Sequence, residues 1–182
     1  MIHYLFPYST TKNIGGAYNE AIRNLKADPT DWIVIKDGDV AFLTPEWGRQ
    51  IAEVAAKTDF QLLGCMTGRL RAKHQLIRGN FDTECNMFTN LEDAILVEAL
   101  HWAEVEEVPG IAGMFMMFRW KTWVEIGGFK EKTIKADMIF NQDVSKIGGK
   151  IGVMKGLYAF HGYRLWERTQ HGAMNSYKHL IK

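Results

Sequence analysis

Apolar and polar positions follow two different periods along the chain, and these periods predict strands and helices in alternation. Continuous apolar runs, typical of buried strands, predict strands at residues 2–6, 32–35, 60–66, 113–118, 151–153 and 157–161. Between these runs, apolar residues at helical spacing predict helices over about residues 14–25, 45–55, 90–103, 120–126 and 137–147, with Asn90 as the cap of the third. Residues 68–89 fit neither pattern and are expected to be irregular.

This alternation also predicts the fold class. Strands that alternate with helices are typical of an α/β domain with a mostly parallel sheet. No repeat, low-complexity tract or change of composition marks a linker, and 182 residues suit one domain. We therefore expect residues 1–182 to form a single three-layer α/β/α domain around a mostly parallel, mixed sheet.

Composition and charge exclude several partners. Hydrophobic residues make up 47% of the chain, which is enough for one sizeable core. The net charge of +1 gives no broad signal for nucleic acid or for an anionic membrane. No apolar run approaches the roughly 20 residues of a membrane span, so no transmembrane segment is expected.

The two cysteines and the first residues bear on the compartment. Cys65 and Cys85 have neither the number for a disulfide framework nor the spacing of zinc ligands, which indicates thiols in a reducing compartment. Met1 to His3 lack the basic start of a signal peptide. These features predict a cytoplasmic protein.

The strongest local signal for chemistry is Asp37-Gly38-Asp39, directly after the apolar run 32–35. Ligands of open α/β sheets bind beyond the carboxyl ends of strands. Two carboxylates one residue apart can converge on a hard cation such as Mg²⁺ or Mn²⁺, which shares its oxygen ligands with substrate phosphates. The alternative interpretation is an exposed turn, because Asp-Gly pairs are common in turns.

Other segments around this pair occur in a definite order. They are Asn13 to Ile22, Asp31 to Asp39 with Pro45 and Trp47, Gly113 to Arg119 with Gly127 to Glu131, and Asn141 to Val144 with Gly149 and His161. In this order they resemble the Ala-Arg-Asn segment, the metal-binding Asp-x-Asp strand, the acceptor-side strand and the Glu-Asp-Val motif of glycosyltransferase family 2. Members of that family have the GT-A fold, and the resemblance extends over about residues 2–164.

The resemblance implies a metal-dependent transfer of a sugar from a nucleoside diphosphate sugar to an acceptor hydroxyl. It implies Mn²⁺ or Mg²⁺ as the cofactor, at a metal site formed by Asp37, Asp39 and His161. In this site Asp39 is expected to bind the metal directly, Asp37 to bind the ribose or a metal-bound water, and His161 to complete the metal shell. UDP is the expected nucleotide and GDP the second choice. The donor is expected to contact Pro7, Tyr8, Ser9, Asn13, Gly16, Asn19, Asp37 and Gly38.

The resemblance also implies a general base for the acceptor hydroxyl. Asp143 occupies the aspartate of the Glu-Asp-Val-like stretch and is the first candidate, ahead of Glu131 and Asp137. A base opposite the leaving group implies inversion at the anomeric carbon. The alternative role for Asp143 is to cap or solvate its helix. The acceptor itself stays undefined, although residues 69–89 and 120–129 are expected on its side.

Three departures from the family pattern narrow these expectations. The strand–helix–strand that usually precedes the Ala-Arg-Asn segment is missing, and with it the acid that reads the nucleobase. Tyr18 replaces the arginine of that segment, and Gln142 stands where a glutamate is usual.

Several other residues have two possible roles. His161 could equally be a structural hydrogen-bonding histidine. The basic residues of the irregular segment could contact phosphates or form a solvated face; they are Arg69, Arg71, Lys73 and Arg78.

Competing functions remain open at this stage. A phosphatase of the haloacid-dehalogenase type also has two aspartates one residue apart after a buried strand, but no later acidic pair fits well. A nucleotidyltransferase shares the metal chemistry, but no basic glycine-rich loop for a triphosphate is present. The non-enzymatic alternative is a module that binds a sugar nucleotide or a carbohydrate without transferring it.

Overall fold

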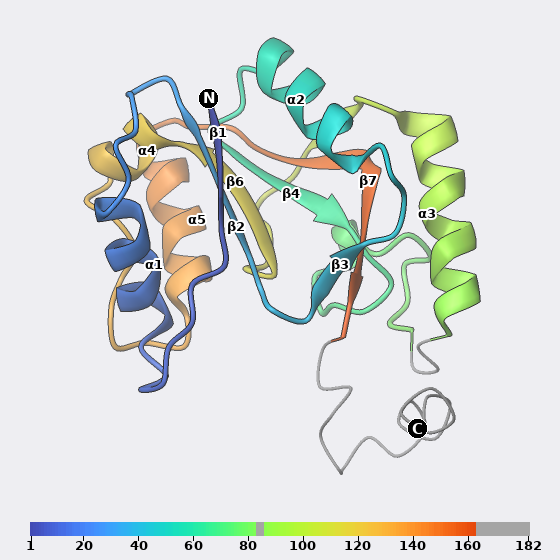
Figure 1. Cartoon of the computed structure of the whole chain (residues 1–182), viewed down its shortest axis with the longest axis horizontal. Helices are drawn as coiled ribbons and strands as arrows, with labels where there is room; N and C mark the ends of the chain where they lie inside the picture. The colour runs from blue at the N-terminus through green and yellow to red at the C-terminus, as the bar shows by residue number, and fades with distance from the viewer. Residues whose placement is uncertain (83–85, 163–182) are drawn as a thin grey trace.

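The computed structural model describes residues 1–82 and 86–162, and Cys85 lies outside this range (Figure 1). Within it, one sheet has the strand order β1-β2-β6-β4-β7-β3, and β5 also pairs with β7. The strands are β1 (Ile2–Leu5), β2 (Trp32–Lys36), β3 (Val40–Phe42), β4 (Leu62–Met66), β5 (Val105–Glu107), β6 (Phe115–Arg119) and β7 (Ile151–His161).

The helices are α1 (Ile14–Arg23), α2 (Trp47–Lys57), α3 (Met87–His101), α4 (Trp120–Glu125) and α5 (Ala136–Lys146), with a short 3₁₀ helix η1 at Lys73–Gln75. Each predicted helix is present, with shifted bounds. The cap of α3 is Asn86, whose side chain accepts from the backbone of Phe88 and Thr89, so the prediction of Asn90 as the cap is wrong. Asn90 is instead buried and accepts a hydrogen bond from Tyr158.

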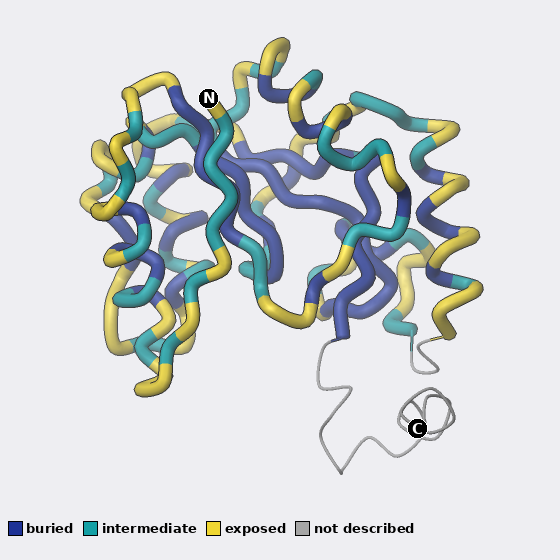
Figure 2. The backbone as a smooth tube through the Cα atoms, viewed as in Figure 1, coloured by how far each residue is buried: buried dark blue, intermediate teal, exposed yellow. Residues whose placement is uncertain are grey.

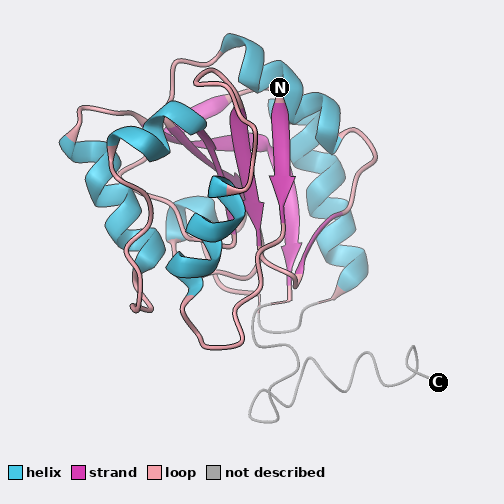
Figure 3. Cartoon of the chain, turned by 60° about the vertical axis from the view of Figure 1, so that its left-hand side comes forward, coloured by secondary structure: helices cyan, strands magenta, loops and turns pink. Residues whose placement is uncertain are grey.

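Helices cover both faces of the sheet (Figure 3). Alternate residues of β2 point to opposite sides: Ile33 and Ile35 pack in a core with side chains of α1, α3 and α5, whereas Trp32 and Val34 pack in a second core with α2. Figure 2 shows the buried strands between the helices, whose outer sides are exposed. The expected α/β class is therefore confirmed.

The sheet is mixed, as expected, but the expectation that it is mostly parallel is wrong. Only β1–β2 and β4–β7 are parallel pairs, whereas β2–β6, β4–β6, β3–β7 and β5–β7 are antiparallel. Within the sheet, β6 lies between β2 and β4 and runs against both, and the short strands β3 and β5 run against β7. The apolar run of β6 is buried on both sides, and such a run has the same appearance in either direction.

The last strand is continuous where the sequence predicted two strands. It pairs with β4 through Met154 and again at Tyr158, with an irregularity between them. At Gly156 a Cβ atom would lie 2.1 Å from the carbonyl oxygen of Trp102. Only glycine allows this approach, and the strand continues through Gly156 to His161. In the described part of the chain, no helix is long and apolar enough to cross a membrane.

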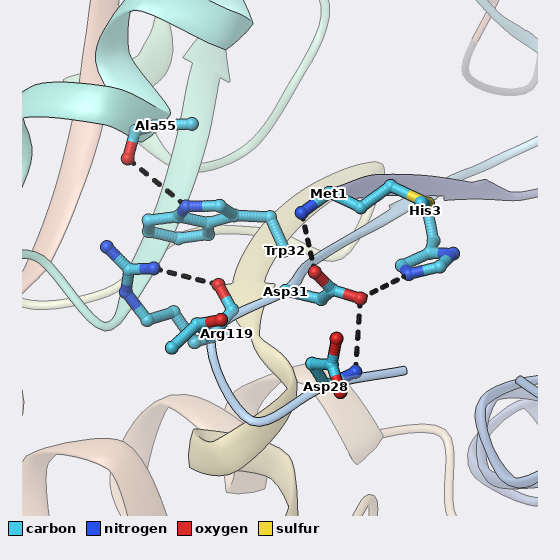
Figure 4. Close-up of polar contacts among 8 residues, drawn as sticks. Met1, His3, Asp28, Asp31, Trp32, Ala55 and Arg119 are labelled. Carbon is cyan, nitrogen blue, oxygen red and sulfur yellow. Dashed lines mark hydrogen bonds and ion pairs between the residues drawn. The ribbon is translucent and has the colours of Figure 1, made fainter. Parts of the chain in front are cut away.

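A buried carboxylate holds the beginning of β2 (Figure 4). Asp31 accepts from His3 at 2.9 Å, from the backbone N–H of Asp28 at 3.1 Å and from the amine of Met1. Next to it, Trp32 donates to the carbonyl oxygen of Ala55 at 3.2 Å. These contacts fix the beginning of the strand whose other end leads into Asp37.

Asp31 makes the stability of the fold depend on pH. Hydrogen bonds from the Met1 amine, His3 and the Asp28 backbone hold the pKa of Asp31 well below its usual range. A lowered pKa contributes stability above the unfolded value of about 4, and this contribution is lost as the pH falls. We expect Asp31→Asn to lower the free energy of unfolding at pH 7, and the difference from the parent protein to shrink below about pH 4.

Urea unfolding across this pH range measures the effect, with Asp28→Asn as the control because Asp28 contacts Asp31 through its backbone N–H and carbonyl and not through its side chain. A difference between Asp31→Asn and parent that stays constant with pH would contradict this role.

Candidate metal centre

The turn between β2 and β3 carries the two aspartates. It is held by the Asp37 N–H, which donates to the carbonyl oxygen of Met114 at 2.9 Å, and by the Val40 N–H, which donates to that of Asp37 at 3.3 Å. Lys36 donates to the carbonyl oxygen of Asp37 at 3.0 Å and also to that of Val40. The lysine therefore ties the two ends of the turn together.

Gly38 lies in the turn, but the turn does not need the left-handed backbone conformation that favours glycine. Its φ is not positive, so its backbone conformation does not demand glycine. No atom lies within 4 Å of the position that a Cβ would take. A side chain could therefore be added at this position without a clash.

Sheet pairing brings a histidine to this turn. β3 runs antiparallel to β7 with Val40 opposite His161, and the N–H of Gly162 donates to the carbonyl oxygen of Asp39 at 2.8 Å. As a result, one ligand atom from each of Asp37, Asp39 and His161 lies within 4.8 Å of the others. We call these three residues the acidic triad.

A backbone carbonyl fixes the orientation of the His161 ring. Its Nδ1 lies 2.9 Å from the carbonyl oxygen of Arg69. A carbonyl oxygen only accepts, so Nδ1 carries the proton and Nε2 of the neutral ring carries the lone pair. Nε2 lies 3.7 Å from Oδ1 of Asp39. Burial lowers the pKa of His161 and favours this neutral form, although the charge of Asp39 acts in the opposite direction.

The ionised form of the Asp37 carboxyl is disfavoured in the folded protein. Burial and the neighbouring charge of Asp39 raise its pKa to about 6, against the hydrogen bond that Tyr18 donates to it. The Tyr18 hydroxyl lies 3.3 Å from Oδ1 of Asp37, and burial raises the pKa of this hydroxyl well above its usual range. Tyr18 therefore gives Asp37 a neutral hydrogen-bonding partner.

Two residues of the acidic triad, Asp37 and His161, line a pocket of about 380 Å³, which we call the metal pocket. Asp137 from the first turn of α5 lines the same pocket. Asp137 accepts from the N–H of Gly113 at 2.9 Å, and a Cβ at Gly113 would lie 2.9 Å from that of Asp137. Arg71 also lines the pocket and adds a positive charge.

The residues expected against the nucleotide are divided between two places. Tyr8, Ser9, Asn13 and Gly16 line a separate hollow of about 380 Å³ beside α1, which also includes Glu131. Pro7 lines neither that hollow nor the metal pocket. Asn13 caps α1 through the N–H of Gly16 at 3.2 Å.

Asn19 is bound within the protein. Its amide donates to the carbonyl oxygen of Phe129 at 2.9 Å and to Glu131 at 3.1 Å, and it accepts from the Phe129 N–H and from Trp123. Its side chain is 1% exposed. Asn19 therefore secures the turn after α4, and its hydrogen-bonding groups are already satisfied.

Asp143, the expected base, does not line the metal pocket. Its carboxylate pairs with Lys146 at 2.7 Å along α5. Asp137, nearly two turns earlier on the same helix, does line it. Arg69 is 1% exposed and packs over the ring of Phe81, so the expectation of a solvated face fails at this residue.

Lys36 and the carbonyl of Arg69 are parts of the site that the sequence analysis missed. Lys36 could have been noticed as the cation directly before the two aspartates. No sequence pattern predicts which backbone carbonyl will orient a histidine.

A comparison with models of protein families finds no match, and a comparison with curated proteins finds none either. The chemistry of the site is therefore inferred from its geometry.

The raised pKa of Asp37 predicts a gain in stability when its charge is removed. Such a group costs free energy as the pH rises from its unfolded pKa of about 4 through its folded pKa. We expect Asp37→Asn to raise the free energy of unfolding by ~1–3 kcal/mol at pH 7.5 in the presence of a chelator. The gain should shrink towards pH 4, where the parent carboxyl is protonated in the folded state.

Chemical unfolding at several pH values measures this effect, with Asp59→Asn as the control because Asp59 is an exposed acid paired with Lys150. A variant that is less stable than the parent protein at pH 7.5 would show that the Asp37 carboxylate is not under this electrostatic cost.

Proposed function

We propose that the protein is a metal-dependent glycosyltransferase that moves a sugar from a nucleoside diphosphate sugar, UDP- in preference to GDP-, to an acceptor hydroxyl with inversion. The observation that carries the proposal is the convergence of Asp37, Asp39 and His161 at the carboxyl end of β2, beside a pocket with a further carboxylate on its wall. Ligands of open α/β sheets bind at this end of the strands.

The donor atoms of the acidic triad suit Mn²⁺ better than Mg²⁺. Two carboxylates supply oxygen ligands, and the fixed tautomer of His161 supplies a neutral imidazole nitrogen. Mn²⁺ accepts both kinds of ligand, whereas Mg²⁺ prefers oxygen alone. The side chain of Asp39 is 36% exposed, so diphosphate oxygens can approach from the solvent side.

Each residue of the site has a role in the proposed transfer. A bound divalent cation supplies charge stabilisation for the leaving diphosphate. Tyr18 holds Asp37 through its hydroxyl, and the Arg69 carbonyl holds His161. Arg71 brings positive charge to the pocket in which the diphosphate would lie.

The reaction itself exchanges one bond for another at the anomeric carbon. The acceptor oxygen bonds to that carbon and gives its proton to a carboxylate. The bond from the carbon to the diphosphate oxygen breaks, and its electron pair leaves with the nucleoside diphosphate. Asp137 is the base that the geometry favours over Asp143, because it lines the metal pocket. Attack opposite the leaving group inverts the anomeric carbon.

A non-catalytic module that binds a sugar nucleotide is the second candidate. One observation favours it: the residues expected against the nucleotide, including Tyr8, Ser9 and Asn13, line a hollow separate from the metal pocket. Such a module would bind the donor without transferring or hydrolysing the sugar.

The metal and the nucleotide should bind together. We expect Mn²⁺ to raise the affinity for UDP by at least about 10-fold in the parent protein, because the diphosphate supplies several of the metal's oxygen ligands. Asp39→Ala should abolish this enhancement, whereas Asp59→Ala should retain it. Isothermal titration calorimetry of UDP with and without Mn²⁺ measures both, and an enhancement that survives Asp39→Ala would overturn the assignment of the site.

The choice of the base can be tested with two matched variants on one helix. We expect Asp137→Asn to lower the rate of transfer by at least about 10²-fold while UDP still binds with Mn²⁺, because the amide cannot take the proton. Asp143→Asn should retain a rate close to that of the parent protein. A radiolabelled transfer assay measures the rates, and NMR of the product gives its anomeric configuration.

The reverse order of these two variants would restore Asp143 as the base. A product with retained configuration would contradict direct displacement. Intact donor binding without transfer to any class of acceptor would favour the non-catalytic module.

A further inference from the structure

A second hollow adjoins the metal pocket and has a different chemical character. It has a volume of about 710 Å³ and shares Ala112 and Asp137 with the metal pocket. Its floor is the loop between β5 and β6, and its walls come from α5 and from the segment around η1. Because Asp137 lies on the wall common to both, one molecule can reach from the hollow to this carboxylate.

The floor of the hollow presents apolar side chains. Pro109, Ile111 and Ala112 lie along it, with Ala72 on one side and Met138 of α5 on the other. Met138 is 44% exposed, so its side chain is accessible to a ligand in the hollow. The hollow is shallow and largely open to solvent, so a ligand would lie against this lining with one side in water.

The polar groups of the floor are already bound inside the protein. The N–H and the carbonyl of Ile111 both bond with the amide of Asn141, at 2.8 and 2.9 Å. The N–H of Ala112 donates to Gln75 at 2.8 Å, and the carbonyl of Gly110 is bound by His74. A hydroxyl that entered this floor would lose its hydrogen bonds to water and meet groups that are already satisfied.

Two polar side chains of α5 on the outer wall are bound within the helix: Ser145 donates to the carbonyl oxygen of Asn141 at 3.1 Å, and Lys146 pairs with Asp143 at 2.7 Å. Gln142 is exposed on the same helix and also lines the hollow. The lining is nevertheless mostly apolar, so it suits an apolar group better than a sugar ring rich in hydroxyls.

We infer that this hollow holds the apolar body of the acceptor, an aromatic or alicyclic group, and that the acceptor hydroxyl projects from it towards Asp137 in the metal pocket. The role of the ligand as an acceptor rests on the proposed glycosyl transfer, whereas the apolar binding site does not depend on that proposal. It gives the acceptor a chemical class: a hydroxyl carried by an apolar ring system, in preference to a free saccharide.

Binding of two probes, 2-naphthol and methyl β-D-glucopyranoside, tests this inference without any nucleotide. Saturation-transfer NMR and competition titrations give the affinity of each probe for the whole protein. We expect 2-naphthol to bind and methyl glucoside to bind at least about 10-fold more weakly, because only the first buries an apolar surface without unpaired hydroxyls. Equal affinity for the two probes would overturn the inference.

Variants of Met138 locate the probe. Met138→Gln keeps the length of the side chain but makes it polar, and should weaken 2-naphthol binding by about 5- to 10-fold. Met138→Leu should restore affinity to within about twofold of the parent protein. The control is Met87→Gln, because Met87 is 38% exposed on α3 and does not line the hollow. Circular dichroism checks that each variant is folded.

Loss of binding with Met87→Gln equal to that with Met138→Gln would place the probe outside the hollow and overturn the inference. Calorimetry of UDP with Mn²⁺ on the same variants separates this result from the proposed function. Retained UDP binding with no preference for 2-naphthol removes the apolar acceptor and leaves the transferase standing. If 2-naphthol binds at Met138 but UDP does not bind, the hollow is an apolar ligand site without a role in binding a glycosyl acceptor.

Discussion

Val40 lies opposite His161 where β3 runs antiparallel to β7, and this pairing joins parts of the chain that are far apart in sequence. It sets the distance between the two aspartates of the β2–β3 turn and the histidine at the end of the last strand. In the same sheet β7 pairs with β4 along one edge and with β3 along the other. Without the pairing of β3 with β7, the turn would carry two acids and no third ligand.

The site is built against an electrostatic cost. Asp37 is largely buried near the charge of Asp39, and its partner Tyr18 brings a hydrogen bond without a positive charge. Lys36, the nearest cation, binds the backbone carbonyls of the turn rather than the carboxylates. The metal-free fold therefore contains a concentration of negative charge that a divalent cation would relieve.

Sequence patterns predicted the parts of this molecule that depend on local burial. The apolar run before Asp37 became β2, and the order of helices was correct. The direction of β6 was not predictable from its apolar run, since both of its faces are buried whichever way it runs. β3 and β5 are only three residues long, too short to show a period.

The candidate site was predictable to the same extent. Asp37 and Asp39 follow a recognisable strand, and the order of motifs drew attention to His161. The choice between Asp137 and Asp143 depends on how α5 is rotated against the loop before β6. Tertiary contacts fix that rotation, and the helical period alone leaves it open. The burial of Arg69 likewise depends on packing that no local pattern contains.

The central claim is that Asp37, Asp39 and His161 hold a metal ion against a nucleoside diphosphate. Pulsed electron paramagnetic resonance of Mn²⁺ bound to the protein with UDP tests it most directly. We predict a nitrogen coupling from the His161 ring and a phosphorus coupling from the diphosphate in the same spectrum, and loss of the nitrogen coupling in His161→Gln. A spectrum with phosphorus coupling alone, or a nitrogen coupling that persists in His161→Gln, would contradict the account.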